Sequence, residues 1–313
     1  MIKYISILAI SLGAFFTTAV LSSYSHPDTE NAIEKETTEE MTSPSQSLPQ
    51  VIKAITLDNN FYFAGEKVPT EIFDVRERLD RELLVNSYWH SATVQNIKLS
   101  NRFFPVIERI LAEEGVPDDF KYLAVAESGL RNATSSAGAK GFWQFLKSTG
   151  KEYGLEINDE VDERYHLEKS TKAACKYLRK QKNKLGSWTL AAAAYNAGSR
   201  RISENLSQQG MSSYYDINLN EETGRYVFRI LALKSILSDP TRFGFQIDDS
   251  QKYAPYSDMV NISYKEEGIL DVKNVALNNG ISYRLLKVYN PWLLDSKITM
   301  SGRKEYFIQV PRR

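Results

Sequence analysis

The feature that most limits the possible folds of this chain is the spacing of apolar residues between Pro69 and Pro240. Positions such as Ile72, Val75 and Leu79 recur at three- and four-residue steps, which is the period of a helix with one buried face. No run in this region alternates apolar and polar residues as a half-buried strand does. The pattern predicts an all-α domain with helices at 69–84, 101–114, 120–127, 144–153, 167–185, 189–197, 202–208 and 221–238.

The C-terminal segment changes character. Residues 260–263 alternate as a short strand, 271–278 and 283–289 have the spacing of two short helices, and 306–310 have the pattern of a closing strand. We therefore expect a mainly α protein that ends in a small α+β module with the order βααβ.

The N-terminal residues are typical of an export signal. Lys3 gives a positive start, residues 5–20 are apolar, and small residues follow up to Ser25. Residues 1–25 are therefore expected to be a signal peptide, with an uncleaved membrane anchor as the alternative, since the apolar run is nearly long enough to span a bilayer. Residues 26–50 are polar and rich in Glu, Thr, Ser and Pro, which predicts a disordered linker. Two folded parts are then expected: 51–248, with a helical extension to about residue 100, and 255–313.

Composition excludes several classes of protein. The 39 basic residues balance the 39 acidic ones, so bulk charge favours no nucleic-acid partner. The single cysteine, Cys175, rules out an intramolecular disulfide and has no metal-ligand partners at finger spacing, so we expect it to be a small buried helical residue. No metal cluster, phosphate loop or nucleotide motif is visible, and we expect no cofactor and no metal site.

Glu127 is the candidate catalytic residue. It follows the apolar run 123–126 and precedes Ser128 and Gly129, which places an acid at a half-buried helix end. Burial raises the pKa of a carboxyl group and keeps it protonated near neutral pH, the state in which a general acid can protonate a glycosidic oxygen. The alternative is a glutamate that is solvated at a helix end and has a structural role only.

Two further motifs accompany this acid. In the segment Gly141-Phe142-Trp143-Gln144, the glycine would let the backbone approach a ligand, an aromatic ring would offer an apolar face to a sugar, and the glutamine amide would bond ring substituents. The alternative is a loop with core aromatics that enters a helix. In the segment 194–198, Tyr195 is either a core aromatic or a residue whose hydroxyl meets the catalytic carboxyl or the substrate.

These motifs, in this order and spacing, resemble the soluble-lytic-transglycosylase (SLT) family, closest to the branch known as membrane-bound murein transglycosylases D. Further matches lie at 148–150, 153–155, 222–223 and 226–227, and the resemblance covers about 101–238. It implies a goose-lysozyme-like α-helical fold. It also implies cleavage of the bond between N-acetylmuramic acid and N-acetylglucosamine without water, which leaves 1,6-anhydromuramyl ends.

The resemblance also implies roles for individual residues. Glu127 would be the sole catalytic acid and later the base, because the nucleophile is a hydroxyl of the substrate itself. Ser128 would orient the substrate or the acid, and Tyr226 would bond the catalytic carboxyl unless it is only a core tyrosine. The other substrate-binding positions implied are Gly141, Trp143, Gln144, Tyr195 and Asn196. Many family members have methionine where this chain has Trp143, but the transglycosylase D branch carries Trp there.

The C-terminal module resembles a divergent LysM module, a peptidoglycan-binding βααβ unit. The matching segments are 280–283, 285–286, 290–291 and Gly302 before Tyr306, while the usual Gly-Asp-Thr-Leu opening is replaced by residues 267–270. The module would bind glycan, or it would simply pack on the catalytic domain.

We therefore expect an exported, monomeric enzyme of the periplasm that acts on the glycan strands of peptidoglycan. If the N-terminus is uncleaved, it would attach the enzyme to the membrane. Two alternatives stay open. A lysozyme-type muramidase would need a second carboxylate, for which Asp159 or Asp162 is available, although the acids between 152 and 163 are expected to be mostly solvated. A non-catalytic wall-binding protein would retain the fold without the activity.

Overall fold

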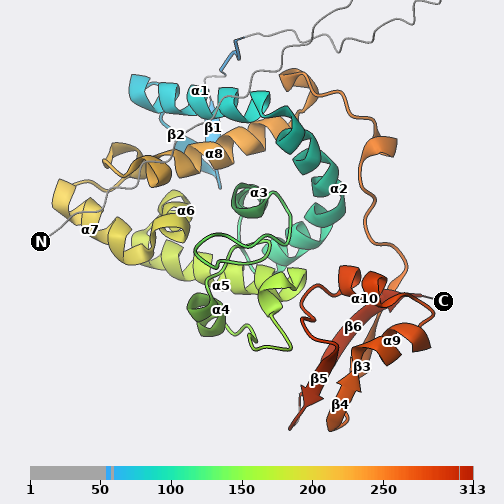
Figure 1. Ribbon diagram of the computed structural model, residues 1–313. Helices are drawn as coiled ribbons and strands as arrows, with labels where there is room; N and C mark the ends of the chain where they lie inside the picture. Colours follow the sequence, from blue (N-terminus) through green and yellow to red (C-terminus); the bar gives the residue numbers. More distant parts are fainter. Residues whose placement is uncertain (1–53, 58–59, 303, 313) are drawn as a thin grey trace, which may run out of the picture. The chain divides into compact units, whose positions relative to one another are not determined.

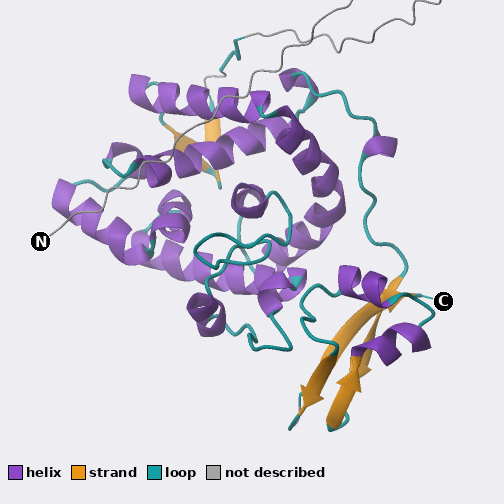
Figure 2. Cartoon of the chain, in the orientation of Figure 1, coloured by secondary structure: helices purple, strands orange, loops and turns teal. Residues whose placement is uncertain are grey.

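The structure is a computed structural model and describes residues 54–57, 60–302 and 304–312. The predicted signal or anchor (1–25) and linker (26–50) lie outside the described residues. Helices dominate up to residue 238, and a small group of strands and helices forms the C-terminal module, so the predicted mainly α class is confirmed (Figure 1, Figure 2). Among the described residues, no helix is both long and apolar enough to cross a membrane.

The helices of the larger part follow the predicted apolar period. Two of them, α5 and α8, have the predicted bounds, and between Pro69 and Pro240 the described residues contain isolated β-bridges but no strand. The helices are α1 (Phe73–Tyr88), α2 (His90–Glu113), α3 (Lys121–Ser128), α4 (Lys147–Glu152), α5 (Leu167–Leu185), α6 (Trp188–Ala197), α7 (Ser199–Gln209) and α8 (Glu221–Ser238).

Helix α2 begins eleven residues before the expected position 101. The buried side of its first half includes Thr93, whose hydroxyl donates a hydrogen bond of 2.5 Å to the carbonyl of Asn86. A polar residue that is satisfied in this way can be buried without contributing to an apolar period. The sequence pattern therefore underestimated the length of this helix.

The N-terminal extension is not wholly helical, which corrects the prediction. Strands β1 (Phe61–Phe63) and β2 (Glu66–Val68) form an antiparallel hairpin whose two-residue turn, Ala64-Gly65, has positive φ at both positions. That conformation matches the twist of paired strands. Phe63 and Val68 are fully buried and fix the hairpin to the helical core.

The core of the larger part lies around α8, which packs against α1, α3 and α6 (Figure 1). Cys175 on α5 is buried in this core, as expected. The arrangement brings the C-terminal ends of α3 and α6 to one side of α8, so the predicted motifs 123–129 and 194–198 meet there.

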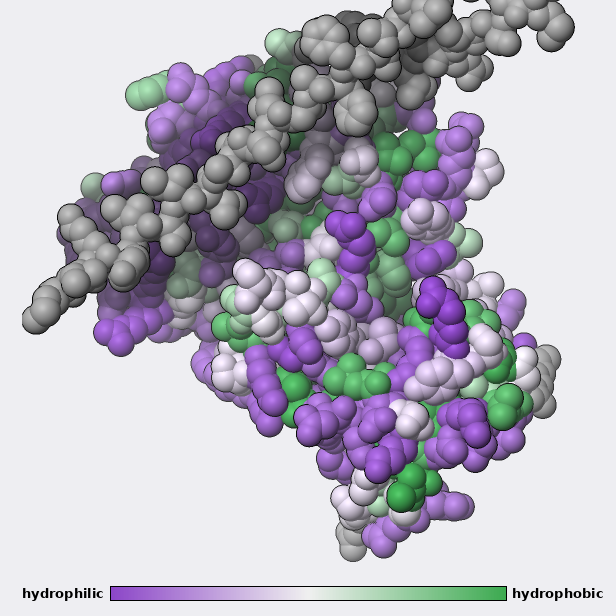
Figure 3. Space-filling view, in the orientation of Figure 1, coloured by the Kyte–Doolittle hydropathy of each residue, from purple (hydrophilic) through white to green (hydrophobic). Residues whose placement is uncertain are grey.

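The module has the predicted strand, helix, helix, strand order and one further pair of strands. Strand β3 (Met259–Tyr264) pairs antiparallel with β6 (Tyr306–Pro311), and β4 (Gly268–Asp271) pairs with β5 (Lys297–Met300). Helices α9 (Val272–Asn278) and α10 (Tyr283–Tyr289) lie between them in sequence. Figure 3 shows hydrophobic residues scattered among hydrophilic ones on its visible surface, and the exposed apolar side chains include Ile269 and Leu277.

Candidate active site

Glu127 lies one residue before the end of α3. This short helix is held by a buried face that includes Leu123 and Ala124, and it ends at Gly129, whose left-handed backbone (φ 58°) closes it. Glu127 as a whole residue is half-buried, and protein atoms surround its carboxyl group densely. The predicted position at a half-buried helix end is therefore found in the structure.

Tyr226 of α8 is the direct partner of this acid. Its hydroxyl donates a short hydrogen bond to Oε1 of Glu127, and its ring is buried in the core. The residue is thus both a core tyrosine and a ligand of the carboxyl group. The contact joins two helices, α3 and α8, that pack on each other.

Burial raises the pKa of Glu127 to about 7, from 4.5 for an unperturbed glutamate. The hydrogen bond from Tyr226 and the positive charge of Arg229 act against this rise, while the negative charge of Glu222 adds to it. A carboxyl group with a pKa of about 7 can release and recover a proton with little free-energy cost near neutral pH. This is the property that a residue acting first as acid and then as base requires.

Tyr195, at the end of α6, occupies the same region. Its hydroxyl donates a hydrogen bond of 2.7 Å to the backbone carbonyl of Trp143, and its ring packs among those of Trp143, Phe145 and Tyr177. Burial and the nearby charge of Glu127 raise the pKa of Tyr195 well above its usual value. Its hydroxyl is therefore a neutral donor beside the acid.

The Trp143 ring does not face a ligand, and this expectation was wrong. The side chain is fully buried, and its Nε1 donates a hydrogen bond of 2.9 Å to the Thr171 hydroxyl. Trp143 contributes its backbone carbonyl, which accepts the hydrogen bond from the Tyr195 hydroxyl and so holds that side chain in place.

Gly141 is explained by packing within the chain rather than by approach to a ligand. A Cβ at this position would lie 1.9 Å from the backbone oxygen of Arg164, and the backbone is left-handed (φ 80°). Three residues on, Gln144 also has positive φ (47°), which is uncommon for a residue other than glycine. Its amide nitrogen donates to the carbonyls of Ala133 and Gly141, at 3.1 and 2.9 Å. These bonds hold the loop in its strained form and leave Gln144 half-buried.

The remaining two predicted positions have clear partners. The Ser128 hydroxyl donates to the Ala124 carbonyl of its own helix, at 3.0 Å, and is buried. Asn196 donates from Nδ2 to Glu222 at 3.1 Å and accepts from the Thr223 hydroxyl at 2.9 Å. Asn196 thus holds the start of α8 against the end of α6.

The acids between 152 and 163 are less solvated than expected. Asp162 is buried and forms two hydrogen bonds with the guanidinium of Arg164, at 2.9 and 2.7 Å. Glu163 is buried too, and its carboxylate accepts from the backbone of Glu156 at 2.8 Å. Asp159 is exposed. A carboxylate held on both oxygens by an arginine is poorly suited to serve as a base.

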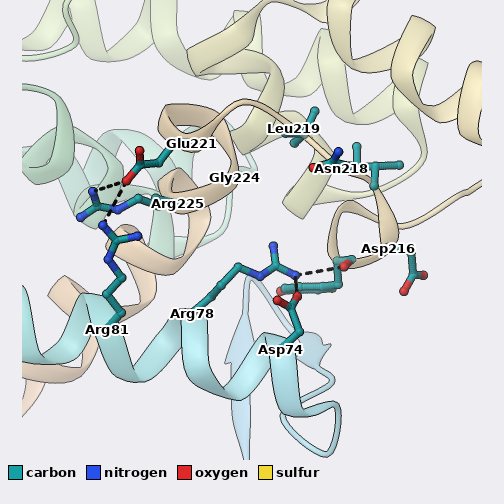
Figure 4. Close-up of a pocket in the computed structure, with 11 residues that line it drawn as sticks. Asp74, Arg78, Arg81, Asp216, Asn218, Leu219, Glu221, Gly224 and Arg225 are labelled. Carbon is teal, nitrogen blue, oxygen red and sulfur yellow. Dashed lines mark hydrogen bonds and ion pairs between the residues drawn. The ribbon is translucent and has the colours of Figure 1, made fainter.

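A separate cavity lies between α1 and the start of α8, and Glu127 is not part of its lining (Figure 4). Its cations are already paired with acids: Arg78 with Asp74 at 2.5 Å, and Arg81 with Glu221 at 3.0 Å. Arg225 approaches the same Glu221 at 3.4 Å. The chemistry of this cavity is that of a salt-bridge network beside the site.

Two charged residues of the site were missed by sequence reasoning. Glu222 and Arg229 both act on the Glu127 carboxyl group through their charges. With Tyr226, they follow each other at i, i+4 and i+7, which is one face of helix α8. Once Tyr226 had been assigned to the site, this spacing could have predicted that Glu222 and Arg229 lie on the same face of the helix.

Comparison with known proteins gives the following matches. Residues 104–218 match the transglycosylase SLT domain family, and residues 260–313 match the soluble lytic transglycosylase C-terminal LysM-like domain family. The chain is similar to membrane-bound lytic murein transglycosylase D of Escherichia coli K12 and of Escherichia coli O6:H1, each 30% identical over 249 residues. The match covers 76% of this chain and 52% of each relative, so the chain spans about half the length of these relatives.

Proposed function

Because residues 104–218 match the transglycosylase SLT domain family and residues 260–313 match the soluble lytic transglycosylase C-terminal LysM-like domain family, we propose that this chain is a peptidoglycan lytic transglycosylase. The proposal rests mainly on one observation: a single half-buried carboxyl group, Glu127, has a pKa of about 7 and accepts a hydrogen bond from Tyr226. The substrate is the glycan strand, cut between N-acetylmuramic acid and N-acetylglucosamine.

In the proposed reaction, Glu127 carries the proton in both steps. It first donates its proton to the glycosidic oxygen as the bond from that oxygen to C1 of the muramic acid breaks. It then takes the proton of the 6-hydroxyl of the same sugar while O6 bonds to C1, which gives the 1,6-anhydro ring. The proton returns to Glu127 and no water is consumed.

The surrounding residues support this cycle through charge and position. Tyr226 and Arg229 favour the ionised form of Glu127 after the first step, while burial favours the protonated form before it. Tyr195, Gln144 and Asn196 are half-buried and would line the glycan cleft, with Ser128 shaping the end of helix α3.

Lysozyme-type hydrolysis is less well supported. It requires a second carboxylate that activates water or stabilises the transition state. Of the two candidates, Asp162 is engaged by Arg164, and Asp159 lies in the exposed part of a segment that contacts the C-terminal module.

We also propose that the protein is exported and acts in the periplasm as a monomer. Residues 1–25 would be a cleaved signal peptide or, as the alternative, an uncleaved N-terminus that attaches the protein to the membrane. The support is the sequence of residues 1–25 and the similarity to relatives that are membrane-bound lytic murein transglycosylases. Glycan binding by the LysM-like module is a further part of this proposal.

Mass spectrometry of the soluble products from intact sacculi tests the reaction. The purified full chain should release fragments lighter by one water than those of a hydrolase. Glu127→Gln should lower the rate by about 100-fold or more, because the general acid and base is lost. Glu204→Gln, the same change on exposed α7, is the matched control and should keep full activity. Products with reducing ends would overturn the lytic mechanism, and activity in Glu127→Gln would overturn the assignment of the acid.

A further inference from the structure

The C-terminal module is joined to the catalytic part by backbone hydrogen bonds. The backbone nitrogen of Asp162 donates to the carbonyl of Trp292 at 2.9 Å, and that of Leu294 donates to the carbonyl of Glu160 at 2.8 Å. Between them, Val161 and Leu293 form an antiparallel β-bridge. The segment 160–162 is thus paired with the segment 292–294 as one strand is with its neighbour.

Side chains strengthen the same junction. The Glu160 carboxylate accepts hydrogen bonds from the backbone nitrogen of Thr299 at 2.6 Å and from its hydroxyl at 2.8 Å. Val161 is fully buried and belongs to the hydrophobic core of the module, although it lies in the catalytic part of the sequence. The Trp292 ring stacks on His166, with 5.6 Å between the ring centroids.

A second contact lies in the segment that leads into the module. The Tyr256 ring lies 4.9 Å from the guanidinium carbon of Arg102 and packs edge-on against Phe103, both on α2. The same ring contacts Tyr289 of α10, with centroids 5.2 Å apart. The module therefore contacts the catalytic part at two separate places. Paired backbone and packed aromatic rings are contacts of a docked domain.

The docked segment continues directly into a residue that supports the active-site loop. Arg164 is buried and pairs through two hydrogen bonds with Asp162, whose backbone is bonded to Trp292. Its remaining guanidinium nitrogen donates to the carbonyls of Gly138 and Phe145, each at 3.1 Å. One side chain therefore fixes both ends of the loop 138–145.

That loop sets the position of groups beside Glu127. Its Trp143 carbonyl accepts the hydrogen bond from Tyr195, and its Gln144 has the strained backbone described above. Gly141 lies against the backbone oxygen of Arg164 so closely that no side chain fits there. A shift of Arg164 would thus be transmitted to the loop by direct contact, and a displacement of about 1 Å at a positioning group can cost a large factor in rate.

We propose that the LysM-like module is a docked support of the active site, and that Arg164 is the positioning residue through which its docking holds the loop 138–145. This inference rests on the proposed function for its effect on rate, and on the contacts above for the docking itself. It assigns the module a role in catalysis that does not depend on glycan binding by the module.

A disulfide tests the docking without reference to activity. Residues that face each other across an antiparallel bridge have Cα separations compatible with a disulfide, so Val161→Cys with Leu293→Cys should cross-link in the full chain under mild oxidation. The native Cys175 is buried and does not compete. Cross-linking that is complete at low protein concentration supports docking, whereas failure to cross-link in the folded protein overturns it.

Kinetics then test the positioning. Glu160→Ala should weaken docking and lower kcat by about tenfold, with a smaller change in KM, because positioning groups act on the chemical step. Glu152→Ala is the matched control, because Glu152 is exposed and pairs with the exposed Lys180, and it should leave kcat unchanged. The Val161–Leu293 disulfide, added to Glu160→Ala, should restore kcat when oxidised and lose it again when reduced. An unchanged kcat in Glu160→Ala, or a loss that the disulfide does not restore, overturns the proposal.

Arg164→Lys tests the positioning role of Arg164 independently. Lysine keeps the charge but cannot form hydrogen bonds with Asp162 and with both loop carbonyls at once. We expect it to lower kcat as Glu160→Ala does and, unlike that variant, to be insensitive to the disulfide. If the wild-type chain released no fragments, the proposed function would fail, and hydrogen exchange of residues 138–145 would still decide the positioning. Faster exchange there in Glu160→Ala than in Glu152→Ala supports it, and equal exchange overturns it.

Discussion

At the scale of single residues, Glu127 satisfies two demands that an exposed carboxylate cannot. In the proposed reaction, burial favours its protonated form for the first step, and Tyr226 with Arg229 favours its ionised form for the second. The balance of these opposite effects puts its pKa at about 7 rather than at either extreme. A single group can then serve as acid and base in one cycle.

Tyr226→Phe should change the pH dependence of the reaction. The hydrogen bond from Tyr226 lowers the pKa of Glu127, so its loss should raise that pKa further. The fall of kcat/KM on the alkaline side, where Glu127 loses its proton, should therefore move to higher pH than in the wild type. Steady-state rates on soluble glycan strands between pH 5 and 9 measure this, and a move to lower pH would contradict the assigned contact.

Glu127→Gln should stabilise the fold at high pH only. Between about pH 4.5 and 7 the folded chain binds a proton at Glu127 that the unfolded chain has released, so this residue lowers the free energy of unfolding as pH rises. The variant has no group that titrates here. Its free energy of unfolding should therefore exceed that of the wild type by an amount that grows from near zero at pH 4 to as much as about 3 kcal/mol at pH 8. Urea unfolding at several pH values tests this, and a pH-independent difference would refute it.

The sequence predicted the helix-end position of Glu127 and its contact with Tyr226, which the structure contains, but it misjudged the Trp143 ring. The burial of Glu127 could be predicted from the apolar run before it, because the run and the acid are adjacent in sequence. The burial of the Trp143 ring depends on Thr171, which is 28 residues away, and no local pattern encodes that contact. The sequence predicted that the backbone at Gly141 approaches a ligand, whereas the group that lies against Gly141 in the structure is the backbone of Arg164.

At the scale of elements, the β1–β2 hairpin supports a helix that carries site residues. The Glu66 carboxylate of β2 accepts hydrogen bonds from the first backbone nitrogens of α6, at Trp188 (2.6 Å) and Thr189 (2.9 Å), and from the Thr189 hydroxyl. A negative charge at this end of a helix is favourable because the unpaired N–H groups there are positive. The other end of α6 carries Tyr195.

Glu66→Ala should therefore destabilise the chain by about 1–2 kcal/mol, because it removes a cap from α6. Glu71→Ala is the control, since Glu71 is exposed and pairs with the exposed Lys67 in the same region, so removing its side chain should change the stability little. Chemical unfolding monitored by circular dichroism measures both. Equal effects of the two changes would argue against the cap.

The helices were predictable where an apolar period continued, and less so where polar groups are buried. The bounds of α5 and α8 follow directly from their sequences. The first half of α2 and the hairpin were missed because Thr93 is satisfied by a neighbouring carbonyl and because strands of three residues are too short to show alternation.

At the scale of the whole molecule, the described residues contain two hydrophobic cores that share a boundary. Val161 belongs to the core of the module, and Glu156 reaches the module through Lys304 at 2.8 Å and the Tyr306 hydroxyl at 3.1 Å. The sequence predicted both parts and left open whether the module packs on the catalytic domain. Their contact could not be derived, because it joins segments more than 120 residues apart with no pattern in either.

Val161→Asp should separate the unfolding of the two parts. The wild-type junction couples them, so we expect one cooperative thermal transition, whereas a charge buried at the junction should give two. Val288→Asp on α10 is the matched control, because that valine is exposed, and it should keep a single transition. Calorimetry distinguishes these cases, and two transitions in the wild type would contradict the coupling.

The burial of Cys175 also bears on how the chain withstands oxidants. Its side chain is fully buried, and burial raises the pKa of its thiol to about 12. Peroxides and disulfides react with the thiolate, which is then scarce and shielded. A protein that works outside the reducing cytoplasm would therefore present no reactive sulfur from cysteine while folded. Any cysteine introduced on its surface would be the one thiol open to a labelling reagent.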